Sequence, residues 1–150
     1  MNLHMDHVVY TDFRAGELSM LLSGKKKMIV RGAAGRKLPY GRVNKGDRLY
    51  FINNNAESHV RGEGIVSNVI NSKKMTETES RSFIESHQDM LLLTDAQLAR
   101  WGGKRYIVLI EVTDVRETDP FGIDKSGYGN MDDWLPVGNI ESVRLRNATH

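Results

Sequence analysis

The sequence predicts a single α+β domain, in which a small β-barrel or strongly curled sheet of five to seven short strands packs against two or three helices. Three observations support this fold class. Short runs of β-branched and aromatic residues alternate with turn residues. Two segments begin with the spacing of a helix capping box. The 150 residues are 39% hydrophobic and 27% charged, which is typical of one globular domain, here expected over residues 1–150.

The first half of the chain favours strands. Its expected elements, in order, are a strand at 7–10, a helix at 13–22, and strands at 27–31, 48–52 and 64–69. The helix places Leu18, Leu21 and Leu22 on one face and ends before Gly24, while the strands consist mainly of β-branched and aromatic residues. Glycines and a proline between 32 and 41 predict a loop.

The second half contains both expected capping boxes. Thr76 and Glu79 start one helix, which is expected to continue to Leu91, and a second box starts the helix 94–101, which ends at a Gly-Gly pair. The nearly continuous apolar run 106–112 predicts a strand buried on both faces. The alternating segment 140–145 predicts a last strand that closes the sheet, and 119–136 predicts a long irregular connection.

Composition limits the possible classes of protein. The chain has no cysteine, which excludes disulfides, thiolate metal sites and a cysteine nucleophile. The five histidines show no ligand spacing, so we expect neither a metal site nor another cofactor. The apolar runs are too short to cross a bilayer and the N-terminus lacks a signal-peptide pattern, so we expect a cytoplasmic protein without membrane contact. We also expect a monomer, with a dimer through the basic and acidic halves as the alternative.

Positive charge is concentrated in residues 24–48, which carry nine Lys or Arg against one acid, Asp47. The net charge of the chain is only +2, because residues 1–74 hold thirteen basic and six acidic residues whereas residues 75–150 hold eight and thirteen. This asymmetry indicates an anionic partner such as a phosphate or a nucleic acid.

The beginning of this basic segment carries a motif. Gly24, Lys26 and Arg31 match three positions of the pattern G-x-K-x-x-E-x-R, and Ile29 stands where the pattern has Glu. The segment thereby resembles the signature of the ASCH family in the PUA-like superfamily. The order of the surrounding elements is also similar to that of a PUA-like barrel, over roughly residues 16–145.

The resemblance implies a small barrel beside a cleft that binds RNA or a modified nucleotide. Some ASCH proteins are amidohydrolases of an acetylated cytidine nucleoside, and others have been proposed to cut RNA. In the amidohydrolases, catalysis is associated with the motif lysine, a threonine three residues later and a distant glutamate. The lysine here is Lys26, but Ile29 occupies the threonine position, which argues against transferring the activity.

Lys26 and Arg31 are therefore expected to bind a phosphate or a base edge, with ordinary solvated cations as the alternative. The loop that follows adds Arg36, Tyr40 and Arg42 as candidate ligands. Its glycines would let backbone amides approach an anion, its guanidinium groups would contact phosphate, and the tyrosine would stack on a base. A mobile basic loop without a ligand explains the same residues equally well.

Candidates outside the basic segment come from two connections. Asn53 ends a strand and would offer its amide to a base, although an Asn run after a strand is more often part of a turn. In the 119–136 connection, Tyr128 would form a wall of a base pocket, and Asp132 or Asp133 would read an amino group. Trp134 is expected to plug the barrel instead.

Three functions remain open. The favoured one is a binding module for RNA or a modified nucleotide, since Ile29 lacks the polar group that the amidohydrolases use. The alternative is an ASCH-type hydrolase or nuclease with Lys26 as the base and Glu63, Asp132 or Asp133 as its carboxylate. The third is a protein-interaction domain that uses the acidic second half.

Overall fold

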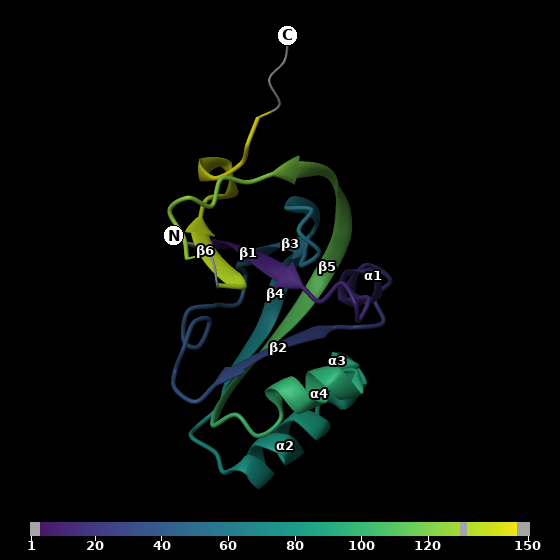
Figure 1. Cartoon of the computed structure of the whole chain (residues 1–150), viewed down its shortest axis with the longest axis vertical. Helices are drawn as coiled ribbons and strands as arrows, with labels where there is room; N and C mark the ends of the chain where they lie inside the picture. Colours follow the sequence, from purple (N-terminus) through teal and green to yellow (C-terminus); the bar gives the residue numbers. More distant parts are fainter. Residues whose placement is uncertain (1–3, 130–131, 147–150) are drawn as a thin grey trace.

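A six-stranded sheet forms the body of the molecule (Figure 1). The computed structural model describes residues 4–129 and 132–146. The strands run in the order β2-β5-β4-β3-β1-β6, with β1 and β3 parallel and the other neighbours antiparallel. Their bounds are Asp6–Thr11 (β1), Met28–Ala33 (β2), Arg48–Asn53 (β3), His59–Asn71 (β4), Tyr106–Gly122 (β5) and Trp134–Gly138 (β6).

Two long strands, β4 and β5, curl the sheet into a half-barrel. Their pairing changes register three times, and each such irregularity bends the strands and increases their twist. In Figure 1, β5 curves along one side of the molecule from the helices at the bottom to the top. The predicted small, curled α+β barrel is therefore confirmed, with a strand number inside the predicted range.

The described residues also form four short helices, more than the two or three that the sequence predicted. They are α1 (Glu17–Leu22), α2 (Glu77–Glu85), α3 (Gln88–Leu91) and α4 (Asp95–Trp101). Both predicted capping boxes are present, because Thr76 and Thr94 each accept a backbone hydrogen bond from the residue three positions later, whose side chain accepts one in return. Helices α2 to α4 gather below the sheet in Figure 1.

The helices and the barrel are packed around separate apolar clusters. Met28, Val30 and Ile107 of the sheet pack with Ile84 and Trp101 of the helices. Inside the barrel a second cluster includes Val9, Leu21, Ile29, Phe51 and Trp134. The expectation that Trp134 plugs the barrel is confirmed, since its side chain is 1% exposed.

The structure corrects two helix boundaries. The helix expected at 13–22 begins only at Glu17, because Gly16 adopts a left-handed backbone conformation and the preceding residues form a turn that the Asp12 carboxylate stabilises through the Ala15 amide. The helix expected from 76 to 91 is divided between α2 and α3, because His87 leaves the helical backbone conformation.

The end of the sheet also differs from the prediction. The strand expected at 140–145 is wrong: a 3-10 helix runs from Ile140 to Ser142, and the Asn139 side chain caps its first turn. Arg144 then forms an isolated bridge with Ile123. The edge strand is β6 instead. The connection expected at 119–136 is shorter than predicted, because β5 extends to Gly122 and β6 begins at Trp134; residues 130 and 131 lie outside the described residues.

None of the helices in the described part of the chain has both the length and the apolar character to cross a lipid bilayer.

A buried polar cluster ties the N-terminal strand to the turn before β3. His7 is fully buried, and its Nε2 lies 2.8 Å from Oδ2 of Asp47. Trp134 Nε1 donates to His7 Nδ1 over 3.0 Å, so Nδ1 carries no proton and Nε2–H donates to the carboxylate. Burial lowers the pKa of His7 below its usual 6.5, and the neighbouring Asp47 offsets only part of that shift.

Stability is therefore expected to fall as the pH decreases below about 6.5. The unfolded chain binds a proton at His7 more readily than the folded chain does, so the stabilisation is complete above this range and is lost on acidification, by at most about 1.4 kcal/mol per pH unit. Urea denaturation between pH 7.5 and 5.5 measures the slope. His7→Gln is expected to reduce the slope of the free energy of unfolding against pH, because the other histidines are common to both proteins. An equally steep slope in the variant would mean that another group causes the loss of stability.

Candidate functional site

A cleft of about 320 Å³ opens where the parallel strands β1 and β3 end. Helix α4 forms one wall and the segment before β6 forms the other. The side chains around it include Tyr10, Asp12, Glu17, Arg31, Asn53, Asn54, Gln97, Arg100, Trp101, Lys125, Asp132 and Asp133.

Arg31 of β2 is the best-anchored charge of the cleft. Its guanidinium donates to the carbonyl oxygens of Val30 and Tyr10 over 2.8 and 2.7 Å. It lies between the rings of Trp101 and Trp134, at 5.6 and 5.7 Å from their centres. These contacts join the two edges of the open barrel, since β2 and β6 are the outer strands of the sheet.

One nitrogen of the Arg31 guanidinium, Nε, makes no hydrogen bond with the described residues. It lies 3.2 Å from Oδ2 of Asp133 as an ion pair, but without hydrogen-bond geometry, although the residue is only 6% exposed. A buried donor without an acceptor is costly. A ligand oxygen in the cleft would relieve that cost.

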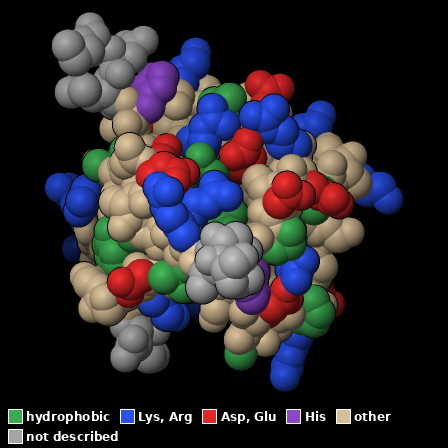
Figure 2. All heavy atoms as spheres, turned by 90° about the horizontal axis from the view of Figure 1, so that it is seen from above, with side chains coloured by type: hydrophobic (Ala, Val, Ile, Leu, Met, Phe, Trp, Pro, Cys, Tyr) green, Lys and Arg blue, Asp and Glu red, His purple; other side chains and the backbone are tan. Residues whose placement is uncertain are grey.

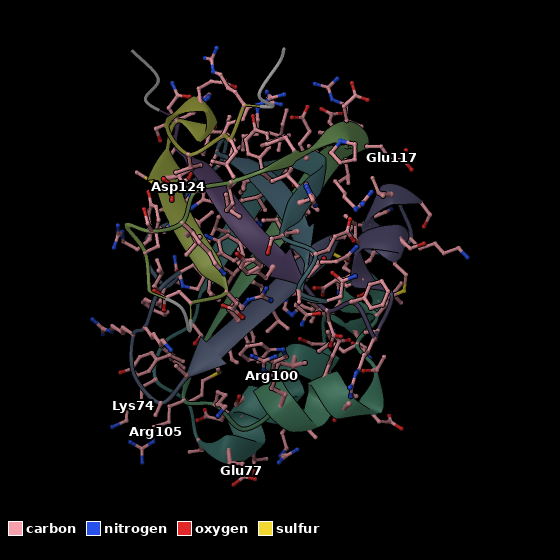
Figure 3. The ribbon with its side chains drawn as sticks, turned by 45° about the horizontal axis from the view of Figure 1, so that its top comes forward. Lys74, Glu77, Arg100, Arg105, Glu117 and Asp124 are labelled. Carbon is pink, nitrogen blue, oxygen red and sulfur yellow. The ribbon has the colours of Figure 1, made fainter. Side chains whose placement is uncertain are left out.

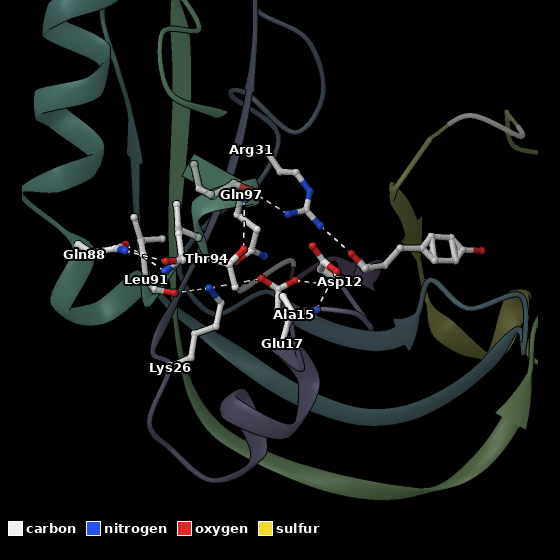
Figure 4. Close-up of polar contacts among 12 residues, drawn as sticks. Asp12, Ala15, Glu17, Lys26, Arg31, Gln88, Leu91, Thr94 and Gln97 are labelled. Atoms are coloured by element: carbon white, nitrogen blue, oxygen red, sulfur yellow. Dashed lines mark hydrogen bonds and ion pairs between the residues drawn. The ribbon is translucent and has the colours of Figure 1, made fainter. Parts of the chain in front are cut away.

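Lys26 lies behind the cleft. Gly24 just before it has φ +79°, a conformation that favours glycine and turns the chain from α1 towards β2. The ammonium group lies 3.3 Å from Oε2 of Glu17 and donates to the carbonyl of Leu91 (Figure 4). Burial lowers the pKa of Lys26, and the Glu17 charge partly offsets this shift.

Glu17 connects this buried pair to the cleft. Its Oε1 accepts a hydrogen bond from the Asp12 amide over 3.1 Å, and both residues line the cleft (Figure 4). Lys26 is 1% exposed and does not line it. The lysine is therefore linked to the cleft through its ion pair with Glu17.

Two aromatic–cation pairs stand on opposite sides of the cleft. The Arg100 guanidinium lies 4.4 Å from the centre of the Trp101 ring on α4, and Figure 3 shows Arg100 between the helices and the sheet. Lys125 lies 5.2 Å from the centre of the Tyr10 ring and donates to the tyrosine hydroxyl over 3.3 Å. Aromatic rings beside cations suit a planar, anionic ligand.

The structure brings only part of the predicted site together. Arg31, Asn53, Asp132 and Asp133 all line the cleft, and Asn53 also accepts a hydrogen bond from Thr11. Asn54 and Asn55 lie in a turn, as the alternative interpretation of the asparagine run after the strand predicted.

The loop candidates lie outside the cleft. Arg36 stacks over the rings of Tyr40 and Tyr106, at 5.9 and 5.5 Å from their centres, and the Tyr40 hydroxyl donates to the Ser72 carbonyl. Arg42 is exposed and does not line the cleft either.

Two further candidates are used elsewhere in the fold. Tyr128 packs against the apolar cluster around Val8 and Tyr50 instead of forming a wall. Glu63 pairs with Arg116 over 2.8 Å and with Arg48 over 3.5 Å, on strands away from the cleft.

Sequence reasoning missed the residues that the fold brings in from separate elements. Tyr10, Asp12, Glu17, Gln97, Arg100, Trp101 and Lys125 were not among the predicted ligands. Trp101 was predicted only as part of a helix, and Lys125 was not predicted to be a ligand in the 119–136 connection. The adjacent Arg100 and Trp101 are the one local signal that indicates a binding surface, since the pair combines charge with a large ring.

Charge is mixed on the surface and in the cleft. Figure 2 shows acidic and basic side chains interspersed on the face at the top of Figure 1. Within the described residues, no group of three or more His, Asp or Glu side chains is placed to hold a metal ion. The cleft itself combines three cations with four carboxylates.

ASCH proteins are among the solved structures that share this architecture. A mutant form of the ASCH protein from Zymomonas mobilis superposes with a TM-score of 0.69 at 12% identity, covering 95% of this chain and 94% of that one. Another structure of the Zymomonas mobilis ASCH protein gives 0.65 at 12% identity, covering 88% and 87%. The chain thus has the ASCH fold, as the motif indicated.

No family model matches the sequence, and no curated protein matches it.

Proposed function

We propose that the protein binds RNA or a modified nucleotide in the cleft between α4 and the ends of β1 and β3. The observation that carries this proposal is the composition of the cleft. It combines two aromatic–cation pairs, Tyr10 with Lys125 and Trp101 with Arg100, with amides and carboxylates.

Each kind of group has a role in such binding. A base would stack beside the aromatic rings, and its edge would contact the Asn53 amide or the carboxylates of Asp132 and Asp133. Phosphate oxygens would accept hydrogen bonds from the exposed cations. The Nε of Arg31, which pairs with Asp133 but makes no hydrogen bond in the described part of the chain, supports a ligand oxygen beside Arg31 in the cleft.

Arg100→Ala is expected to weaken binding of short single-stranded RNA by roughly five- to tenfold at low salt, since it removes one charge-assisted contact from a partly exposed site. The side chain of Arg100 is 59% exposed, so the fold should tolerate the change. Fluorescence anisotropy with labelled RNA at several salt concentrations measures the affinity and its salt dependence.

The matched control is Arg81→Ala, which removes an exposed arginine on α2 with a side chain 52% exposed and no place in the cleft. The Arg81→Ala variant should bind the RNA with the same affinity as the wild type. Equal effects of the two substitutions, or RNA affinity that does not change with salt, would contradict binding at the cleft.

Hydrolysis of a modified nucleoside or RNA is the second candidate, and one observation favours it. Lys26 has a lowered pKa and contacts Glu17, whose carboxylate lines the cleft. Because Lys26 does not line the cleft, the group that would face a substrate is the Glu17 carboxylate, with the lysine as its partner. Incubation with acetylated nucleosides and labelled RNA tests this candidate, and the absence of turnover on all of them would discard it.

A further inference from the structure

Three side chains that line the cleft end in an amide, and each amide turns its oxygen towards the protein. Oε1 of Gln97 accepts from the Thr94 amide over 3.0 Å, and Oδ1 of Asn54 accepts from the Phe13 amide over 2.8 Å. Oδ1 of Asn53 accepts from a threonine hydroxyl of β1 over 3.3 Å. Within the part of the chain that the structure describes, the three amide nitrogens donate no hydrogen bond, so they remain as donors for a ligand.

Gln97 is the amide whose orientation is most firmly fixed. It belongs to the α4 capping box and is only 5% exposed, and Figure 4 draws its contact with Thr94. The Thr94 N–H can only donate, so turning the Gln97 amide over would set one donor against another. Gln88 on α3 differs, because both ends of its amide bond to the backbone of Leu93. The Nε2 of Gln97 is therefore held as a donor at the cleft.

A nearly buried donor suits an oxygen that projects from the far edge of a ring. A base enters a cleft with its sugar outside, so the edge away from the sugar reaches the buried donor. Guanine and uracil carry an oxo group on this edge where adenine and cytosine carry an amino group. An oxo group accepts from Nε2, whereas an amino group would set its own donors against it.

The cleft also has an acceptor for the proton that accompanies such an oxygen. A ring with an oxo group on this edge carries an N–H beside it, and the Asp12 carboxylate lines the same cleft. The donor of Gln97 and the acceptor of Asp12 together match the oxo group and its neighbouring N–H.

We infer that Gln97 determines which bases the cleft accepts, because its Nε2 donates to an oxo group at the edge of the base away from the sugar. The cleft therefore prefers guanine- and uracil-like bases to adenine- and cytosine-like bases. This inference rests on the proposed function and specifies its ligand class. It gives Gln97 a role in selection beyond its role in capping α4.

The test compares ligands that differ at this edge of the base. Inosine and adenosine monophosphates form one pair, and uridine and cytidine monophosphates form the other. In each pair the first ligand has an oxo group where the second has an amino group. Isothermal titration calorimetry measures the affinity of the oxo ligand divided by that of the amino ligand. Both members of a pair carry the same phosphate, so a charge that a variant introduces affects both affinities and leaves their ratio unchanged.

In the pair that the wild type binds more tightly, the ratio is expected to be about five to ten, which is the effect of one hydrogen bond. Gln97→Met keeps the length of the side chain without a polar group, so the ratio should fall to about one. Gln97→Glu replaces the donor by an acceptor, so the ratio should fall below that of the methionine variant. The glutamate can keep the capping box, because Glu79 fills the same position in the box of α2.

The matched control is Glu79→Gln, which makes the reverse exchange at an exposed residue of α2 outside the cleft and should leave the ratio unchanged. If Gln97 only caps α4, its substitutions change stability and leave the ratio at the wild-type value, which would overturn the inference. A wild-type ratio of one or less in both pairs would overturn it as well. Gln97→Met carries the test even if Gln97→Glu does not fold.

The proposed function fails differently, because in that case the wild type binds none of the four monophosphates and no single-stranded RNA.

Discussion

Lys26→Met is expected to lower the free energy of unfolding by about 3–5 kcal/mol. The substitution keeps the length of the side chain but leaves the buried Glu17 carboxylate without its counter-ion, which lies 3.3 Å away, and the Leu91 carbonyl without its donor. Breaking one partner of a buried ion pair is far more costly than replacing both. Urea denaturation at neutral pH measures the loss.

Two variants separate this cause from others. Adding Glu17→Gln to Lys26→Met should restore at least half of the lost stability, because a neutral amide replaces the unpaired charge and its oxygen still accepts from Asp12. Lys27→Met makes the same change at the next residue, which is exposed, and should stay within about 0.5 kcal/mol of the wild type. A loss below about 1 kcal/mol in Lys26→Met would contradict a structural role for the pair.

The Lys26 prediction affects how activity should be assigned. If a hydrolytic turnover is found, its loss in Lys26→Met has a structural explanation as well as a chemical one. The stability of each variant must therefore be measured beside its turnover. The Lys26→Met/Glu17→Gln double variant is informative, since it is expected to be better folded and still lacks the amine.

Asp47→Ala is expected to cost about 3–5 kcal/mol, because the Asp47 carboxylate is 1% exposed and accepts three hydrogen bonds. Its donors are the amides of Met5 and Asn44, over 3.1 and 2.9 Å, and the ring of His7 over 2.8 Å. Removing the acceptor leaves the buried ring of His7 and two part-buried backbone amides without their partner, and loosens the turn before β3. Thermal or urea denaturation measures the effect.

Asp47→Asn is a milder substitution at the same position. Its amide oxygen can still accept, so its loss should be about half that of the alanine variant. Asp119→Ala removes an exposed carboxylate of β5 and should be nearly neutral. Equal stabilities of Asp47→Ala and Asp119→Ala would contradict the role of the cluster.

The order of most elements was predictable because it depends on local patterns. The capping boxes at Thr76 and Thr94 fix two helix starts through contacts only three residues apart. The apolar run from Tyr106 predicted the core strand for the same reason. The strand expected at 140–145 failed because its alternation was outweighed by the Asn139 cap, which starts a 3-10 turn.

The candidate site was less predictable, because it depends on contacts between distant residues. Arg31 was found through its motif, yet its partners Tyr10 and Asp133 lie 21 and 102 positions away. Lys26 was found in the same way, but no pattern indicated that Glu17 would pair with it behind the cleft. The basic loop was predicted to bind a ligand from its charge, its glycines and its tyrosine, and none of these determines where a loop folds.

The sequence by itself determined an α+β barrel, the motif residues of the ASCH fold and an excess of positive charge in the first half of the chain. Only the tertiary structure decided which of these charges meet. Curling of β4 and β5 brings the ends of β1 and β3 beside α4 and the segment before β6, so the cleft collects Arg31, Arg100 and Lys125 from separate elements. Local periodicity sets the elements, whereas long-range packing sets the site.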